Sequence, residues 1–279
     1  MERPLWNKIV EEVGRESPQT EIWPTFYGEA LIMGYKSELW ERLDYADQAG
    51  CKNLVLNSNG TLLDRWDNID RILNSPLKRF ILSLDGLSKE TFELIREKAK
   101  WEEVYPAVER LCAERIRRRQ KYPAIVAQFS VMRQNAHEVD ADRKYWNARG
   151  AEVKIRPMLE WTATGTVRTD TIVHDSQFRI ACPWGNNTMA IHQDGSVVAC
   201  AVDYEGRFRP VTSRTLPSRR RGAAWASGCA SRIANTGGTT FPISARDAAT
   251  GRLPALNTRR KAWKARGPSG TTMRLMPRI

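Results

Sequence analysis

The chain has 279 residues, of which 41% are hydrophobic and 27% are charged, and its formal net charge is +12. No run of about 18 apolar residues is present, and the N-terminal residues do not combine a basic flank with an apolar core, so we expect neither a membrane span nor a secretory signal. We therefore expect a cytoplasmic protein, in which the five cysteines are free thiols or metal ligands rather than disulfides.

The positive charge is concentrated near the C-terminus. Residues 209–279 contain 15 of the 44 Lys and Arg residues but only one acidic residue, Asp247. The first 208 residues hold the other 29 basic and 31 acidic residues, which makes them nearly neutral. The net charge therefore does not indicate a nucleic-acid-binding face on this part of the chain.

Helical and extended patterns alternate along residues 1–205. Apolar spacing predicts helices over Leu5–Val13, Ser37–Ala49, Leu62–Leu73, Lys89–Lys98, Val104–Arg119 and Glu138–Arg149. Strands are predicted over Ile22–Tyr27, Leu54–Leu56, Phe80–Leu84, Ala124–Met132 and Val153–Pro157. Ser88 is predicted to begin one helix, and Gly50 and Gly150 to end two others. This α/β alternation predicts a parallel sheet covered by helices, either an open doubly wound sheet or a full or partial barrel.

The pattern stops after Phe208. Residues 209–279 are mostly Arg, Ala, Gly, Ser, Thr and Pro, without sustained helical or strand periodicity. Such a composition buries little apolar surface, so we expect a basic tail of low order. It fits a genuine basic tail and a translation out of frame equally well.

Polar residues follow the predicted strands, where α/β folds bind their ligands. After the first strand, Gly28 allows close approach of a ligand to the backbone, and Glu29 can hold a ligand ammonium group. After the second strand, Asn59 lies in the polar turn Asn57–Gly60.

The next two strands add further polar groups. Ser83 and Asp85 end the third strand, and Arg96, one helix later, is a possible partner for a carboxylate. Gln128 is polar among the apolar neighbours of the fourth strand. Each motif alone has an ordinary structural explanation, but their order on successive strand–helix units favours one shared ligand pocket.

In this order and spacing, the motifs resemble the radical S-adenosylmethionine (SAM) superfamily, in the branch that carries a C-terminal SPASM or twitch domain. The segments concerned are Gly28-Glu29, Asn57–Leu63, Phe80–Gly86, Phe92–Arg96, Gln128–Met132 and Val153–Pro157, and the resemblance spans about residues 5–206. It implies a partial six-stranded barrel, in which a reduced [4Fe–4S] cluster cleaves SAM to a 5′-deoxyadenosyl radical that abstracts hydrogen from a substrate.

The resemblance also implies roles for individual residues. Gly28 and Glu29 match the motif that holds the methionyl amine of SAM, and Asn59 matches the floor of the same pocket. Ser83, in the motif that includes Asp85, matches a position near the ribose or carboxylate. Arg96 matches a possible carboxylate partner, and Gln128 would flank the adenine.

A second pattern concerns Cys182 and Cys200. They flank Gly195 as C-x12-G-x4-C, and Asp194-Gly195 predicts a hairpin turn that brings the two thiols toward one site. The pattern resembles the first half of the SPASM cysteine signature, which makes both residues candidate metal ligands; the alternative is two buried cysteines of a hairpin. Cys51 and Cys112 are expected to be ordinary cysteines, and His137, His174 and His192 lack a zinc-binding spacing.

Two features depart from the family pattern. The sequence contains no C-x3-C-x2-C loop, and only Cys229 follows Tyr204. We therefore expect the polypeptide as given not to cleave SAM reductively; a truncated start with a shifted frame, or a degenerate homologue, explains this. The predicted regions are 1–160, a partial barrel; 161–208, a SPASM-like hairpin segment; and 209–279, the basic tail.

Three functions follow from these patterns. The first is a radical SAM/SPASM-type iron–sulfur protein that acts, in full-length form, on a peptide, a sugar or a small metabolite and needs an electron donor. The second is a non-catalytic, partner-binding homologue that retains the scaffold. The third, nucleic-acid binding through the Arg-rich tail, is disfavoured because the rest of the chain has no basic stripe.

Overall fold

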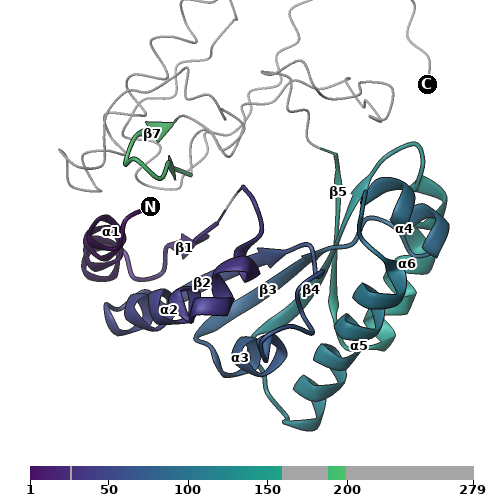
Figure 1. Ribbon diagram of the computed structural model, residues 1–279, viewed down its shortest axis with the longest axis horizontal. Helices are drawn as coiled ribbons and strands as arrows, with labels where there is room; N and C mark the ends of the chain where they lie inside the picture. Colours follow the sequence, from purple (N-terminus) through teal and green to yellow (C-terminus); the bar gives the residue numbers. More distant parts are fainter. Residues whose placement is uncertain (26, 159–187, 199–279) are drawn as a thin grey trace, which may run out of the picture. The chain divides into compact units, whose positions relative to one another are not determined.

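The computed structural model describes residues 1–25, 27–158 and 188–198, in which helices and strands alternate (Figure 1). The α-helices are α1 (Arg3–Glu16), α2 (Glu38–Gln48), α3 (Asn68–Asn74), α4 (Lys89–Ile95), α5 (Trp101–Arg117) and α6 (Val139–Ala148). Two 3₁₀ segments are η1 (Ala30–Lys36) and η2 (Ala136–Glu138). The strands are β1 (Glu21–Ile22), β2 (Asn53–Ser58), β3 (Leu77–Ser83), β4 (Ala124–Val131), β5 (Glu152–Pro157), β6 (Ala190–Ile191) and β7 (Val197–Val198).

The first five strands form one parallel sheet in the order β1-β2-β3-β4-β5. Because the spatial order follows the chain order, the described sheet has no point at which the strand order reverses. The prediction of a parallel sheet covered by helices is confirmed, whereas the doubly wound alternative is wrong for these strands.

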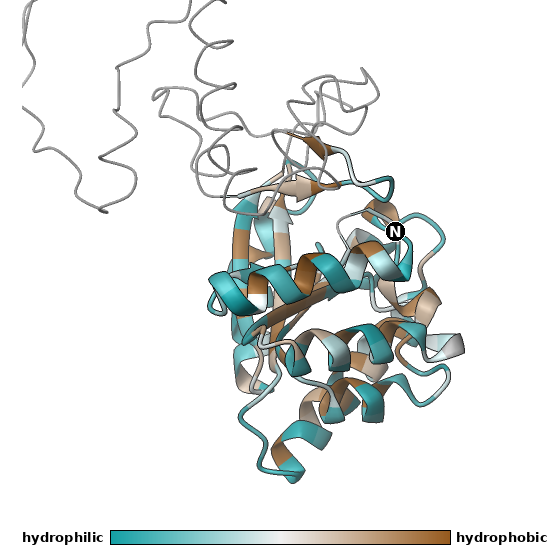
Figure 2. Cartoon of the chain, turned by 90° about the vertical axis from the view of Figure 1, so that its left-hand side faces the viewer, coloured by the Kyte–Doolittle hydropathy of each residue, from teal (hydrophilic) through white to brown (hydrophobic). Residues whose placement is uncertain are grey.

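The α-helices of the described residues all pack against one face of this sheet. Their buried side chains share a single core with alternate residues of the strands; examples are Val10, Leu43, Phe92, Tyr105 and Trp146 from the helices and Leu54, Leu56, Phe80, Leu82 and Ala127 from the strands. Figure 2 shows apolar strands next to helices whose colour alternates along their length, as expected for amphipathic helices.

The opposite face carries a second, smaller apolar cluster. Val55, Ile81 and Val126 are buried there, and Trp23 packs against them. No helix of the described residues contributes to this cluster, and we call this side of the sheet the helix-free face. Since side chains alternate along a strand, residues two positions from these also belong to the helix-free face.

Two predicted elements differ from the structure. The helix expected over Leu62–Leu73 begins only at Asn68, because Trp66 and Asp67 adopt φ values of +51° and +57°, which interrupt a right-handed helix. The strand expected over Ile22–Tyr27 ends at Ile22, since β1 contains only Glu21 and Ile22. Pro24 cannot extend it, because it has no N–H to donate to a neighbouring strand.

The hairpin turn predicted at Asp194-Gly195 falls between two short strands. Strands β6 and β7 are antiparallel, and Gly195 has a φ of +87°. Cys182 and Cys200 lie outside the described residues. The same holds for residues 161–187 and 199–208 of the predicted SPASM-like segment and for the whole 209–279 tail. No helix among the described residues is long and apolar enough to cross a membrane.

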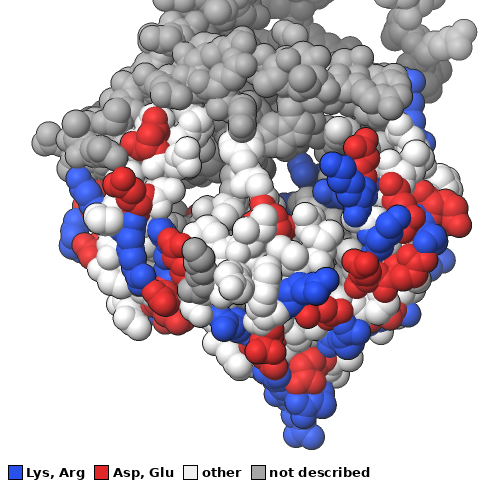
Figure 3. Space-filling model, viewed as in Figure 1, with Lys and Arg blue, Asp and Glu red and all other residues white. Residues whose placement is uncertain are grey.

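The surface charges of the described residues are mixed. Figure 3 shows Lys and Arg interspersed with Asp and Glu over the visible face. Many of them form ion pairs between neighbouring elements, such as Arg3 with Glu41 and Arg149 with Glu109. This distribution agrees with the near-neutral composition of the first 208 residues.

Candidate functional site

Glu29 connects the loop after β1 to the end of β2. Its Oε1 accepts hydrogen bonds from the backbone N–H of Leu31 (3.0 Å) and from the hydroxyl of Ser58 (2.8 Å). Its Oε2 accepts one from the N–H of Asn59 (2.8 Å). A carboxylate offers about four acceptor positions, so Oε2 retains one position for a further donor such as an ammonium group.

Gly28, immediately before Glu29, leaves space beside the backbone. It is exposed, has a φ of +80°, and a Cβ placed on it would meet no atom within 4 Å. A ligand can therefore approach the main chain here more closely than at a residue with a side chain.

Asn59 shapes the turn after β2. Its Oδ1 accepts hydrogen bonds from the N–H of Thr61 (3.0 Å) and from the Thr61 hydroxyl (2.7 Å). The main-chain N–H of Asn59 binds Glu29. The structure thus brings two predicted site residues, Glu29 and Asn59, into direct contact.

Asp85 and Arg96 form a second contact between predicted site residues. The carboxylate of Asp85 is 5% exposed, pairs with the guanidinium of Arg96, and accepts a hydrogen bond from the N–H of Ser130 (2.6 Å). Asn135 donates to the carbonyl of Asp85 (2.8 Å) and to that of Ser130 (2.9 Å). Asp85 therefore connects the ends of β3 and β4 and positions Arg96. The buried Nε of Arg96 has no hydrogen-bond partner among the described residues.

Ser83 and Gln128 lie side by side on the helix-free face. They are paired in the register of β3 and β4, and the amide nitrogen of Gln128 lies 3.4 Å from the Ser83 hydroxyl. The predicted site residues thus form three pairs: one at the end of β2, one just after β3, and one between the end of β3 and the middle of β4. The carboxyl ends of parallel strands share one edge of the sheet, where such groups serve a common ligand.

Two cationic residues of β5 join this edge although the sequence did not single them out. Lys154 is the register partner of Gln128, and Arg156 is the partner of Ser130. Arg156 is close enough to Asp85 and Arg96 for both charges to influence its pKa. The available signal was the alternation of Val153, Lys154, Ile155 and Arg156, which places the two cations on one face of the strand.

The two described cysteines belong to the core of the fold. Cys51 and Cys112 are buried, and burial raises the thiol pKa of both, to about 11 for Cys112. Among the described residues, no group of three or more His, Cys, Asp and Glu side chains could hold a metal ion. His137 lies beside Glu138, at 3.8 Å, while His174 lies outside the described residues.

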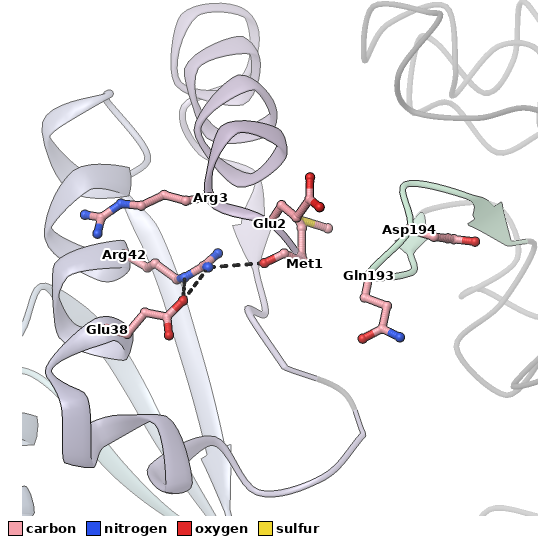
Figure 4. A pocket seen from close by; sticks show the side chains of 7 residues that line it. All are labelled: Met1, Glu2, Arg3, Glu38, Arg42, Gln193 and Asp194. Atoms are coloured by element: carbon pink, nitrogen blue, oxygen red, sulfur yellow. Dashed lines mark hydrogen bonds and ion pairs between the residues drawn. The ribbon is translucent and has the colours of Figure 1, made fainter.

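A polar pocket is lined by residues at the start of α1, by two residues of α2 and by the turn between β6 and β7, and some of these groups bind each other (Figure 4). The guanidinium of Arg42 donates to Glu38 (2.6 Å) and to the carbonyl of Met1 (3.1 Å). These bonds hold the start of α1 against α2, so Arg42 and Glu38 serve the fold rather than a ligand.

Known structures share this fold. No protein-family model matches the sequence, and no curated protein matches it. The structure of anSMEcpe with bound AdoMet and Cp18Cys peptide is 16% identical, with a TM-score of 0.51 over 78% of this chain and 71% of that chain. The structure of Streptococcus suis SuiB bound to the precursor peptide SuiA is 9% identical, with a TM-score of 0.51 over 78% of this chain and 57% of SuiB.

Both proteins are radical SAM enzymes of the SPASM/twitch type. At 16% and 9% identity the similarity concerns the fold. The chain shares the fold of these two proteins.

Proposed function

We propose that this chain is the SAM-binding part of a radical SAM/SPASM-type protein and that SAM binds at the carboxyl edge of its sheet. The observation that carries the proposal is the pairing of predicted ligand residues from successive strand–helix units, with Glu29 and Asn59 as the first pair. The sequential parallel sheet supports the finer assignment to a partial barrel of the radical SAM type.

The residues present fit SAM. The free acceptor position on Glu29 suits the methionyl ammonium, and the open space at Gly28 admits the ligand next to the backbone. Arg96 and Ser83 would hold the carboxylate or ribose, with Asp85 as the support of Arg96. Gln128, on the next strand, would flank the adenine, and Asn59 would form the floor. In this family, SAM supplies hydrogen-abstraction chemistry when it is bound next to a reduced cluster.

The described residues do not fit the catalytic [4Fe–4S] cluster. Neither buried cysteine belongs to a group of potential ligands, and the sequence holds no C-x3-C-x2-C motif. Cys182 and Cys200 stay proposed ligands of an auxiliary cluster, in a segment 161–208 of the SPASM type. We therefore propose SAM binding without reductive cleavage for the polypeptide as given.

We propose a peptide as the substrate of the complete enzyme. The structures of anSMEcpe and SuiB contain the Cp18Cys peptide and the precursor peptide SuiA, respectively. An electron donor would be needed for turnover. The non-catalytic, partner-binding alternative is favoured by the missing cysteine motif, since it keeps the scaffold without the cluster.

The test is calorimetric titration of SAM into the full chain, before and after anaerobic reconstitution with iron and sulfide. We expect SAM to bind, and Glu29→Ala to weaken binding by about tenfold, since it removes a charge-assisted hydrogen bond. Glu97→Ala removes an exposed carboxylate at the end of α4 and is the matched control.

Three results would change the assignment. Absence of SAM binding by the wild-type chain would favour the partner-binding scaffold. Stable binding of a SAM-cleaving cluster would contradict the proposal that this polypeptide binds without cleavage. Nucleic-acid binding that falls steeply with salt and disappears on deletion of residues 209–279 would support the third function.

A further inference from the structure

Strand β5 presents two cations on the helix-free face. Val153 packs with the helix-side core, so its neighbours in the strand, Lys154 and Arg156, face the other way. The ammonium of Lys154 lies 5.7 Å from the centre of the Trp23 ring, which belongs to the apolar cluster of that face. The two charges are therefore held beside apolar surface.

The neighbouring cations pair with carboxylates of the described residues, but these two do not. Arg79 pairs with Glu21, and Arg96 pairs with Asp85. Lys154 and Arg156 form no ion pair with any carboxylate of the described residues. Within the described part of the chain, the buried Nε of Arg156 also has no hydrogen-bond partner.

Lys154 is exposed and Arg156 is half-buried, and the surroundings of both disfavour the positive charge. Burial lowers the pKa of Lys154, and the nearby Arg156 and Arg79 lower it further, against a smaller opposing effect of Glu21. Burial also lowers the pKa of Arg156, where Asp85 opposes and Arg96 adds to the effect. Local conflicts of this kind are expected at functional sites, and a bound anion would relieve this one.

We infer that Lys154 and Arg156 form a binding site for a carboxylate of the substrate peptide. The inference rests on the proposed function for the identity of the ligand as a peptide. Cα atoms two apart in a strand are separated by about 6.6 Å, so both side chains can reach one carboxylate. Gln128 and Ser130, their register partners on β4, add polar groups on the same face.

The test measures the protection of Lys154 from amine acetylation in the full chain, quantified by mass spectrometry of the proteolytic fragment that contains it. The probe is a synthetic peptide of five Gly-Glu repeats, and its control is the matching Gly-Gln peptide. Lys144, exposed on α6, serves as the internal control in the same digest. A site-resolved readout separates binding on β5 from binding elsewhere on a basic chain.

We expect the Gly-Glu peptide to protect Lys154 and not Lys144, and the Gly-Gln peptide to protect neither. Arg156→Met should raise the peptide concentration needed for half-protection by about tenfold. Arg156→Lys keeps the charge and should recover part of the affinity. This recovery would show that the loss in Arg156→Met does not come from misfolding. Equal protection of both lysines, or by both peptides, would overturn the inference.

Two further arms separate this inference from the proposed function. Protection by inorganic phosphate at concentrations where acetate has no effect would assign the site to phosphate and overturn the carboxylate. Protection by SAM alone would assign the two cations to the SAM site and overturn it as well. If the Gly-Glu peptide protects Lys154 but SAM does not bind in calorimetry, the proposed SAM site fails and the carboxylate site stands.

Discussion

Glu138 and Asp142 are two buried carboxylates one helical turn apart, and their pKa values are shifted in opposite directions. Glu138 accepts hydrogen bonds from the N–H of Leu87 (2.6 Å) and the hydroxyl of Thr91 (2.8 Å), among others. Burial alone would raise its pKa, but these bonds and those from Ser88 outweigh burial and hold the pKa below its usual value. The carboxylate of Asp142 accepts a bond from the indole N–H of Trp146 (3.2 Å), and burial raises the pKa of Asp142 to about 7.

Asp142 should make the protein less stable as the pH rises. Its folded-state pKa is above the ordinary value of 3.8, so its contribution to stability is fully present below pH 3.8 and is lost as the pH rises through about 7. Asp142→Asn, which keeps an acceptor for Trp146, should therefore gain stability over the wild type between pH 4 and pH 8. The gain should reach at most about 4 kcal/mol, from 1.36 kcal/mol per pKa unit, measured by urea unfolding at both pH values.

The difference between the variant and the wild type isolates this group, because Glu138 is present in both proteins. Asp140→Asn changes an exposed carboxylate of the same helix and is the matched control. The same pH-dependent gain in the Asp140 variant, or none in the Asp142 variant, would contradict the buried, proton-binding state of Asp142.

At the scale of elements, the junction of β3 with α4 and α5 leaves no room for a side chain at Gly86. A Cβ on Gly86 would lie 2.8 Å from the backbone nitrogen of Phe92 and 2.9 Å from a methyl group of Thr91. The hydroxyl of Tyr105 in α5 donates to the carbonyl of Gly86. This close approach fixes the loop that carries Asp85, and through Asp85 the position of Arg96.

Substitution by alanine should therefore act differently at two glycines. Gly86→Ala should lower the free energy of unfolding by about 2 kcal/mol through overpacking. Gly28→Ala should cost only about 1 kcal/mol, because its positive φ is strained but no atom is nearby. In calorimetry, Gly28→Ala should instead lose more of the SAM affinity, since the added methyl group occupies the proposed ligand space. Equal loss of stability in both variants would contradict this account.

The sequence predicted the elements whose signals are local. Ser88 begins α4 with its hydroxyl accepting the N–H of Thr91 (3.2 Å), and Gly50 and Gly150 have φ values of +100° and +77° after their helices. The first half of the helix expected over 62–73 failed because its apolar spacing also suits a loop that packs Leu63 into the core. Periodicity records which residues are buried, and a folded loop satisfies it as well as a helix does.

The site was predicted less completely, because its contacts join residues far apart in sequence. Strand ends placed Glu29, Asp85 and Gln128 on neighbouring elements, but nothing local indicated that Asp85 would accept the N–H of Ser130 or that Glu29 would bind Ser58. These pairings depend on the strand order and register. When the strand order is unknown, the sequence indicates only that Lys154 and Arg156 lie on a solvent-facing strand. It does not indicate that they are neighbours of Gln128 and Ser130.

At the scale of the whole molecule, the two faces of the described sheet serve different purposes. One face is used by the helices for the core, and the helix-free face keeps polar groups near the carboxyl edge. The residues proposed to contact SAM belong to separate segments: the loop after β1, the ends of β2 and β3, the residue that follows α4, and β4. A ligand that contacts all of these segments would link strands that otherwise contact only their neighbours in the sheet.

SAM should therefore stabilise the whole described sheet rather than one loop. Binding to the folded state alone adds about 2.7 kcal/mol at a ligand concentration one hundred times the Kd, so the Tm should rise with the logarithm of SAM concentration. Differential scanning calorimetry of the full chain would measure this rise, with Lys144→Met as a control that retains it. Glu29→Ala should shift the dependence to about tenfold higher SAM concentration. A Tm that stays constant while calorimetry detects SAM binding would place the ligand on a part of the chain that unfolds independently of this sheet.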